Sequence, residues 1–222
     1  MTSPDPNAAI TEVRTYFVRG RNAMLARADF GPLYIDYYLH LADQHLRPAK
    51  EHDAMLKDAL AAMTLHLASK PQDEVCAWTL NFHDPLVNLF VTGKSRPCAV
   101  TGRVFTEDVR DFGKNVLISQ TTRPDHAPLQ SMIEFHTDDI FTSVEQYYEQ
   151  SEQRPTRLFR LDEEDIVMVS AQPDCDLDCS RRSQRMTSAI SMRRNNSACS
   201  NNVNTFFIAA VRWNVCIPCL KN

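Results

Sequence analysis

Hydrophobic residues recur at two different spacings along the chain, and the spacing separates predicted strands from predicted helices. In residues 10–28 apolar and polar side chains alternate loosely, which is typical of strands. Gly20 lies between Arg19 and Arg21 within this segment. Because glycine in a strand pattern often marks a turn or a bulge, the segment predicts two short strands joined or bent at Gly20.

Two helices are predicted next. Asp29 can cap the first helix and Pro32 fits its first turn. The apolar residues that follow at nearly helical spacing are Leu33, Tyr37, Leu41 and Leu46. The second helix comes after Pro48. Its apolar stripe consists of Met55, Leu56, Leu60, Met63 and Leu67. Lys57, Asp58 and His66 lie around this stripe.

Short β-rich runs follow, separated by turn residues such as Gly93, Pro97 and Gly113. These predicted strands cover residues 75–82, 86–91, 98–105, 115–121 and 129–135. A further helix is predicted from about Asp138 to Gln153, capped by Asp138 or Asp139 and ended by Pro155, and two last strands cover residues 157–161 and 166–171. Runs of helices and runs of strands predict an α+β fold, with a mixed or antiparallel sheet flanked by helices.

The charge of the chain is divided unevenly, although its formal net charge is only −4. Residues 1–178 hold all 28 acidic residues, whereas residues 179–222 hold seven basic residues and no acidic ones. The second segment is also rich in serine and asparagine. We therefore expect one main domain over residues 1–174 and an irregular, basic tail over residues 175–222.

Composition excludes several classes of protein. A chain of 222 residues that is 43% hydrophobic can bury a self-sufficient core, so a wholly disordered chain is excluded. The longest apolar run has six residues, far below the roughly 20 of a membrane span, so no membrane partner is expected. The chain has five glycines and no glycine-rich phosphate loop, which argues against ATP use. With no visible secretory signal, we expect a cytoplasmic protein.

The seven cysteines gather towards the end of the chain. Cys76 and Cys98 lie in the main domain, and the other five are Cys175, Cys179, Cys199, Cys216 and Cys219. Structural disulfides are not expected in the cytoplasm, so this late cluster favours metal binding or thiol redox chemistry.

The segment 144–159 resembles the signature of the Hsp33 family, the redox-regulated holdase chaperones. The residues that carry the resemblance are Ser151, Glu152, Gln153, Pro155, Thr156 and Arg157. Weaker resemblances occur in the family's order at residues 16–21, 51–68, 101–104, 113–121 and 129–135, so that the match covers about residues 10–174. By turn chemistry alone the signature predicts a helix-to-strand corner with no chemistry of its own, because Pro155 stops the helix.

The resemblance implies a chaperone and not an enzyme. Such a protein holds unfolded client proteins on exposed apolar surface without ATP, and family members are expected to form homodimers. The resemblance also implies a C-terminal module in which four cysteines bind zinc when reduced and form disulfides when oxidised. Because thiolates are the zinc ligands, their oxidation expels the metal and unfolds the module.

The tail departs from the family's pattern, which is Cys-x-Cys followed later by Cys-x-x-Cys. This chain has Cys175-x-x-x-Cys179, then 36 residues, then Cys216-x-x-Cys219. Zinc sites do use pairs spaced by two to four residues, so these four cysteines are the candidate zinc and redox residues. The alternative is that they are free thiols in a poorly ordered tail.

The serine, asparagine and arginine content of residues 180–204 supports that alternative. It leads to the hypothesis that the chain is a divergent or truncated family member whose tail arose from a shift of reading frame near Cys179. The main domain would then bind clients constitutively or aggregate, because the covering module would be absent. A gene that continues in the normal frame through Cys179 would exclude this hypothesis.

Two other function classes remain open. The basic cysteine-containing tail, which includes Trp213, could belong to a zinc-dependent nucleic-acid-binding protein, but the acidic main domain argues against nucleic acid as a partner. A hydrolytic enzyme could use His83 or His136. However, His83-Asp84-Pro85 reads as a turn, and His136 with its neighbours His126, Asp125, Asp138 and Asp139 matches no standard set of metal ligands.

Two aromatic segments are predicted to lie mainly in the core. Cys76 beside Trp78 is expected to be a buried thiol. Tyr34, Tyr37 and Tyr38 are expected to be mostly buried, with one exposed face as a candidate surface for partners.

Overall fold

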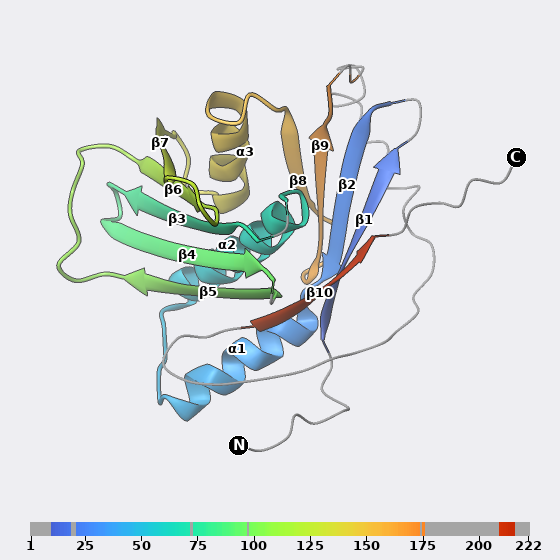
Figure 1. The fold of residues 1–222 in the computed structure, drawn as a ribbon. Helices are drawn as coiled ribbons and strands as arrows, with labels where there is room; N and C mark the ends of the chain where they lie inside the picture. The colour runs from blue at the N-terminus through green and yellow to red at the C-terminus, as the bar shows by residue number, and fades with distance from the viewer. Residues whose placement is uncertain are drawn as a thin grey trace, which may run out of the picture.

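The computed structural model describes residues 10–18, 21–71, 73–96, 98–173, 175 and 209–215. Three helices are found in these residues: α1 (Gly31–Asp43), α2 (Lys50–Ala68) and α3 (Ile140–Gln150). The strands, shown with the helices in Figure 1, are β1 (Thr11–Val18), β2 (Ala23–Asp29), β3 (Val75–Phe82), β4 (Val87–Ser95), β5 (Cys98–Phe105), β6 (Val116–Thr122), β7 (Leu129–Glu134), β8 (Thr156–Arg160), β9 (Asp165–Ala171) and β10 (Ala209–Val215).

The strands form two antiparallel groups that β10 joins. One group has the spatial order β7-β6-β3-β4-β5 and the other has the order β1-β2-β9-β8. Strand β10 pairs antiparallel with β5 and parallel with β1, which links the two groups into one sheet. The predicted α+β class, with a sheet flanked by helices, is confirmed.

Helix α2 is the centre of the core. Its residues 59–67 are all buried, and the helix packs against β4, β5 and α3 as well as against β1, β2 and β9. In Figure 1 α2 lies behind β3, β4 and β5, and none of the three helices lies in front of these strands. The sheet group that contains them therefore buries one face against α2 and leaves its outer face without a helical cover.

Two glycines allow α2 to approach the sheet closely. A Cβ added at Gly93 would lie 2.5 Å from Cδ1 of Leu67, and one added at Gly102 would lie 2.8 Å from Cδ1 of Leu56. Both distances are too short for real contacts, so side chains at these positions would push the helix away from β4 and β5. The absence of a side chain here is thus a packing requirement of the core.

Most element boundaries agree with the sequence-based expectations to within a few residues. Three differ for physical reasons. Helix α1 has Phe30 at its cap position, and Asp29 instead accepts a hydrogen bond from the amide of Gly31. Helix α3 ends at Gln150, before the residue expected, because Gln153 has a φ of 50° and so leaves the helical conformation ahead of Pro155. Strand β10 was not predicted: its residues belong to the tail that was expected to be irregular, and they are extended because they pair with β1 and β5, which are distant in the chain.

His66 differs most from expectation, because the sequence placed it beside the apolar stripe of α2 and the structure buries it completely. Its Nδ1 lies 2.6 Å from the hydroxyl oxygen of Tyr148, and its ring contacts the rings of Trp78 and Tyr147. Its Nε2 has no hydrogen-bond partner among the described residues. Burial, together with the positive charges of Lys70 and Arg154, lowers the pKa of His66 well below its usual range.

The buried imidazole makes stability depend on pH. In the unfolded chain His66 takes up a proton near its ordinary pKa of 6.5, whereas in the folded protein it stays neutral. The free energy of unfolding should therefore fall as the pH drops below 6.5, by about 1.4 kcal/mol at pH 5.5 relative to neutral pH.

Urea unfolding of the wild type and of His66→Gln at pH 7.5, 6.5 and 5.5 measures this loss. Glutamine does not titrate, so the variant should lack the decline assigned to His66 even though the substitution lowers its stability at every pH. An identical pH dependence in both proteins would contradict the assignment.

Candidate functional site

The signature residues 151–157 form the corner between α3 and β8. Ser151 is the C-cap of α3 and donates a hydrogen bond from Oγ to Oγ of Ser131 at 2.9 Å. Gln153 is exposed and turns the chain. The carbonyl of Pro155 accepts a hydrogen bond from the amide of Ala171 at 2.8 Å. The first half of the corner is therefore held by short polar contacts to neighbouring strands.

Thr156 and Arg157 tie the corner to the elements on either side. Thr156 is buried, and its Oγ1 lies 3.0 Å from Oγ of Ser170 on β9. Nη1 of Arg157 lies 3.4 Å from Oε2 of Glu145 on α3, and Glu145 also accepts a hydrogen bond from the amide of Leu158 at 2.8 Å. These contacts fix the angle between α3 and the β8–β9 hairpin.

Glu152 links the corner to the end of α2. Both of its carboxylate oxygens accept hydrogen bonds from Nζ of Lys70, at 2.7 and 2.8 Å, and Oε1 accepts one from the hydroxyl of Tyr147 at 2.9 Å. Burial alone would raise the pKa of Glu152, but its hydrogen bonds to Lys70 and Tyr147 and the charges of Lys70 and Arg154 outweigh burial and lower it. Glu152 is therefore held as a carboxylate.

Arg154 extends the same network across the core. Its guanidinium lies over the ring of Tyr148, 5.2 Å from the centroid, and donates from Nη2 to Oγ of Ser69 at 3.1 Å. Burial raises the pKa of Tyr148 to about 12. The network joins α2, α3 and the corner through the ion pair of Glu152 with Lys70 and the contacts of Arg154 with Ser69 and Tyr148. The signature is thus a structural corner, as its turn residues indicated.

Sequence reasoning missed the partners of the signature. Lys70 lies 82 residues before Glu152, and Ser69 lies 85 residues before Arg154, so no local spacing connects them. The sequence shows that Lys70 follows the last turn of the second helix, but this position does not indicate which residue Lys70 contacts.

Three of the exposed large apolar side chains lie together on α1. Ile35 is 59% exposed, Tyr38 is 45% exposed and Leu39 is 63% exposed, all on one side of the helix. The opposite side packs Leu33, Tyr34 and Tyr37 into the core. The expectation that this tyrosine group is mostly buried with one exposed face is therefore confirmed, and Tyr38 is the exposed member.

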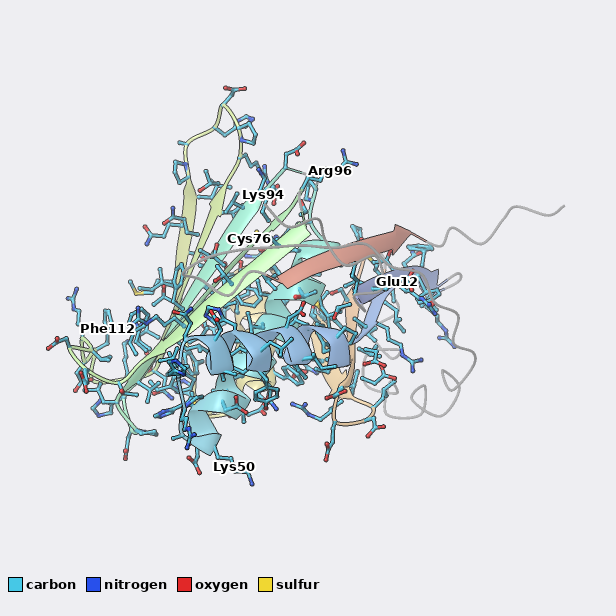
Figure 2. All side chains as sticks on the ribbon, turned by 90° about the horizontal axis from the view of Figure 1, so that it is seen from below. Glu12, Lys50, Cys76, Lys94, Arg96 and Phe112 are labelled. Atoms are coloured by element: carbon cyan, nitrogen blue, oxygen red, sulfur yellow. The ribbon has the colours of Figure 1, made fainter. Side chains whose placement is uncertain are left out.

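A cleft of about 590 Å³ continues this apolar side of α1. It lies between the end of α1 and the start of α2, and Tyr38, Leu41 and Leu46 form its apolar wall. Arg47 and Lys50 line its rim without an ion-pair partner in the described part of the chain, and Figure 2 shows Lys50 at the outer end of α2. The apolar wall and the basic rim together form a surface that suits an apolar segment more than a small reactive substrate.

Two hydrogen bonds and a cation–π contact also order this surface. Tyr38 donates from its hydroxyl to Oδ2 of Asp53 at 2.8 Å and accepts from Nζ of Lys57 at 2.9 Å. Nζ of Lys57 also lies 5.2 Å from the ring centroid of Tyr34. The polar end of Tyr38 is thereby fixed while its ring remains available to solvent.

The two histidines considered for hydrolysis each lie near one exposed carboxylate. Nδ1 of His83 lies 2.8 Å from Oδ1 of Asp111, and both side chains are about half exposed. His136 is largely exposed, with Nδ1 3.9 Å from Oε1 of Glu134. Within the described ranges, no three His, Cys, Asp or Glu side chains come together as metal ligands.

The cysteines are only partly described. Cys76 is fully buried among the strands, as expected, and burial raises the pKa of its thiol (Figure 2). Cys175 is half-buried just beyond β9, and its amide donates to the carbonyl of Gln172 at 3.0 Å. Cys179, Cys216 and Cys219 lie outside the described residues, so the zinc and redox prediction rests on the sequence. No helix in the described part of the chain is long and apolar enough to span a membrane.

Comparison with known proteins places these features in a family. The fold is similar to that of the 33 kDa chaperonin, a heat shock protein 33 homologue, from Thermotoga maritima, with a TM-score of 0.64 and 11% sequence identity. This likeness covers 93% of the present chain and 80% of the other. A comparison with curated proteins finds no match. The Hsp33 protein family model matches residues 38–192, which include the corner at 151–157, and the chain therefore belongs to the Hsp33 family of chaperones.

Proposed function

We propose that this chain holds unfolded client proteins without ATP and so keeps them from aggregating. The observation that carries the proposal is the apolar side of α1, where Ile35, Tyr38 and Leu39 are each about half exposed or more. A soluble protein gains nothing in folding from large apolar side chains left in water. Their clustering beside an apolar cleft supports a role in binding exposed apolar segments of other proteins.

The proposal requires no reactive side chain. Binding an unfolded segment buries apolar area on both partners, at roughly 25 cal/mol per Å², and is reversed by competition with the client's own folding. In the signature corner Glu152 is bound by Lys70, and Arg154 donates to Ser69. The sequence lacks a glycine-rich phosphate loop, which supports holding without nucleotide.

Redox control through zinc is a further proposal that follows from the family. The candidate ligands Cys175, Cys179, Cys216 and Cys219 have a chemically suitable donor set of four thiolates. Of these four only Cys175 lies among the described residues, so we derive no step through the metal. We also propose cytoplasmic residence and a homodimer, as expected for the family.

The role of α1 can be tested with a double variant. Ile35→Ser with Leu39→Ser removes two exposed apolar side chains and leaves the buried side of α1 intact. Wild type should suppress light scattering when guanidinium-unfolded citrate synthase is diluted into nucleotide-free buffer. The double variant should need about fivefold more protein for the same suppression, because about 1 kcal/mol of apolar contact is lost.

Leu86→Ser is the matched control, because Leu86 is also exposed but lies in the turn between β3 and β4. It should act like wild type. The assay is run under reducing conditions and after peroxide treatment. If wild type fails to suppress scattering both under reducing conditions and after peroxide treatment, the holdase proposal is wrong.

The zinc proposal has an independent test in the reduced, purified protein. Four thiolates bound to one zinc would leave about three of the seven cysteines free to react with a thiol reagent under native conditions. One zinc per chain and about three reactive thiols would support the switch. The proposal would be wrong if the protein contained no zinc and all seven cysteines reacted with the reagent, with none of them protected in the native state.

A further inference from the structure

Strand β7 ends one side of the sheet and has no neighbouring strand beyond it in the described part of the chain. The strand order begins β7-β6-β3, and Figure 1 shows β7 at the margin of the sheet with α3 beside it. An edge strand presents unpaired backbone donors and acceptors that can pair with another extended chain. What matters is which backbone groups of β7 face outward.

Three contacts fix the alternation of these groups. The amide of Phe135 donates to the carbonyl of Asn115 at 3.2 Å, so residues 135, 133, 131 and 129 point their backbone groups toward β6. The carbonyl of Glu134 accepts from Nε2 of Gln150 at 3.1 Å, so it points away from β6. In agreement, the carbonyl of Val116, which is opposite Glu134, accepts from Asn81 on β3.

It follows that Gln130 and Met132 direct their amides and carbonyls outward. Gln150 already occupies the outward carbonyl of Glu134, so the open part of the edge is centred on these two residues. Their four outward groups have no partner among the described residues. A short extended segment could pair with all four.

The edge lacks the features that usually protect an exposed strand. Residues 129–134 contain no proline, lysine or arginine, and Leu129 and Met132 are 60% and 62% exposed. The one charged side chain, Glu134, is paired with Lys114 at 2.6 Å. By contrast β8, at the other end of the strand order, carries Arg157 and Arg160.

We propose that the β7 edge binds an uncharged, extended segment of an unfolded client as an additional strand. The inference rests on the proposed holdase function and names a mode of binding for it. Pairing through backbone groups is tolerant of client sequence, because every residue except proline carries the same donor and acceptor. The apolar side chains of Leu129 and Met132 add contacts to alternate faces of the incoming strand.

The test uses a fluorescent seven-residue peptide of alternating threonine and valine, and the same peptide methylated at every backbone nitrogen. Fluorescence anisotropy measures their binding to the full chain. The unmodified peptide should bind, and the methylated peptide should not, because it has side chains but no backbone donors. Equal binding of both peptides would overturn the proposal.

Two variants of Gln130 isolate the contribution of the protein's own edge. Gln130→Pro removes one outward donor without removing a ladder bond to β6, whereas Gln130→Ala keeps that donor. The proline variant should weaken peptide binding at least about fivefold, and the alanine variant should bind like wild type. Circular dichroism and the urea midpoint confirm that both are folded.

If Gln130→Pro fails to fold, Met132→Lys replaces it, with Gln120→Lys as the control on the same outer face of β6. Only the lysine at position 132 should weaken binding. Sedimentation velocity adds a separate outcome: a wild-type dimer that Gln130→Pro converts to a monomer would identify a second copy as the occupant and overturn the proposal. If the Gln130→Pro or Met132→Lys variant binds the peptide as wild type does, this inference is wrong. The holdase function would still stand if wild type suppresses citrate synthase aggregation.

Discussion

The burial of residues 59–67 of α2 on every side is the constraint on which the rest of the structure depends. A helix with nine consecutive buried residues must be enclosed, so one sheet group packs on it through Gly93 and Gly102 while the other group and α3 close around it. Because α2 occupies the interior, α1 is left at the surface with one apolar side uncovered. The same arrangement places β7 at an open margin of the sheet.

The signature corner keeps this enclosure in place. Glu152 and Arg154 reach back to Lys70 and Ser69 at the end of α2, and Thr156 holds β9. Each contact joins segments that are far apart in the chain, so their effect is to fix how α2, α3 and the β8–β9 hairpin meet. A motif that identifies the family thus supports the scaffold, and the surfaces that we propose for client binding lie elsewhere.

The two surfaces proposed for client binding, the exposed side of α1 and the β7 edge, offer different kinds of contact. The exposed side of α1 offers apolar side chains next to the cleft with an apolar wall and a basic rim, and therefore suits apolar segments. The β7 edge offers backbone groups, and therefore suits extended segments of almost any uncharged sequence. The proposed holdase function requires contacts with clients of no fixed sequence, and neither of the two proposed surfaces requires a particular client sequence.

The sequence by itself determined the α+β class, nearly all of the elements and the family, because periodicity, turn residues and a local signature are encoded within short segments. It also identified the tyrosine group of α1 as partly exposed. Only the tertiary structure decided that His66 is buried against Tyr148, that Glu152 pairs with Lys70, and that Gln130 and Met132 direct their backbone groups outward. Each of these depends on contacts between distant segments, and strand register and helix enclosure are set by packing that no local pattern of residues records.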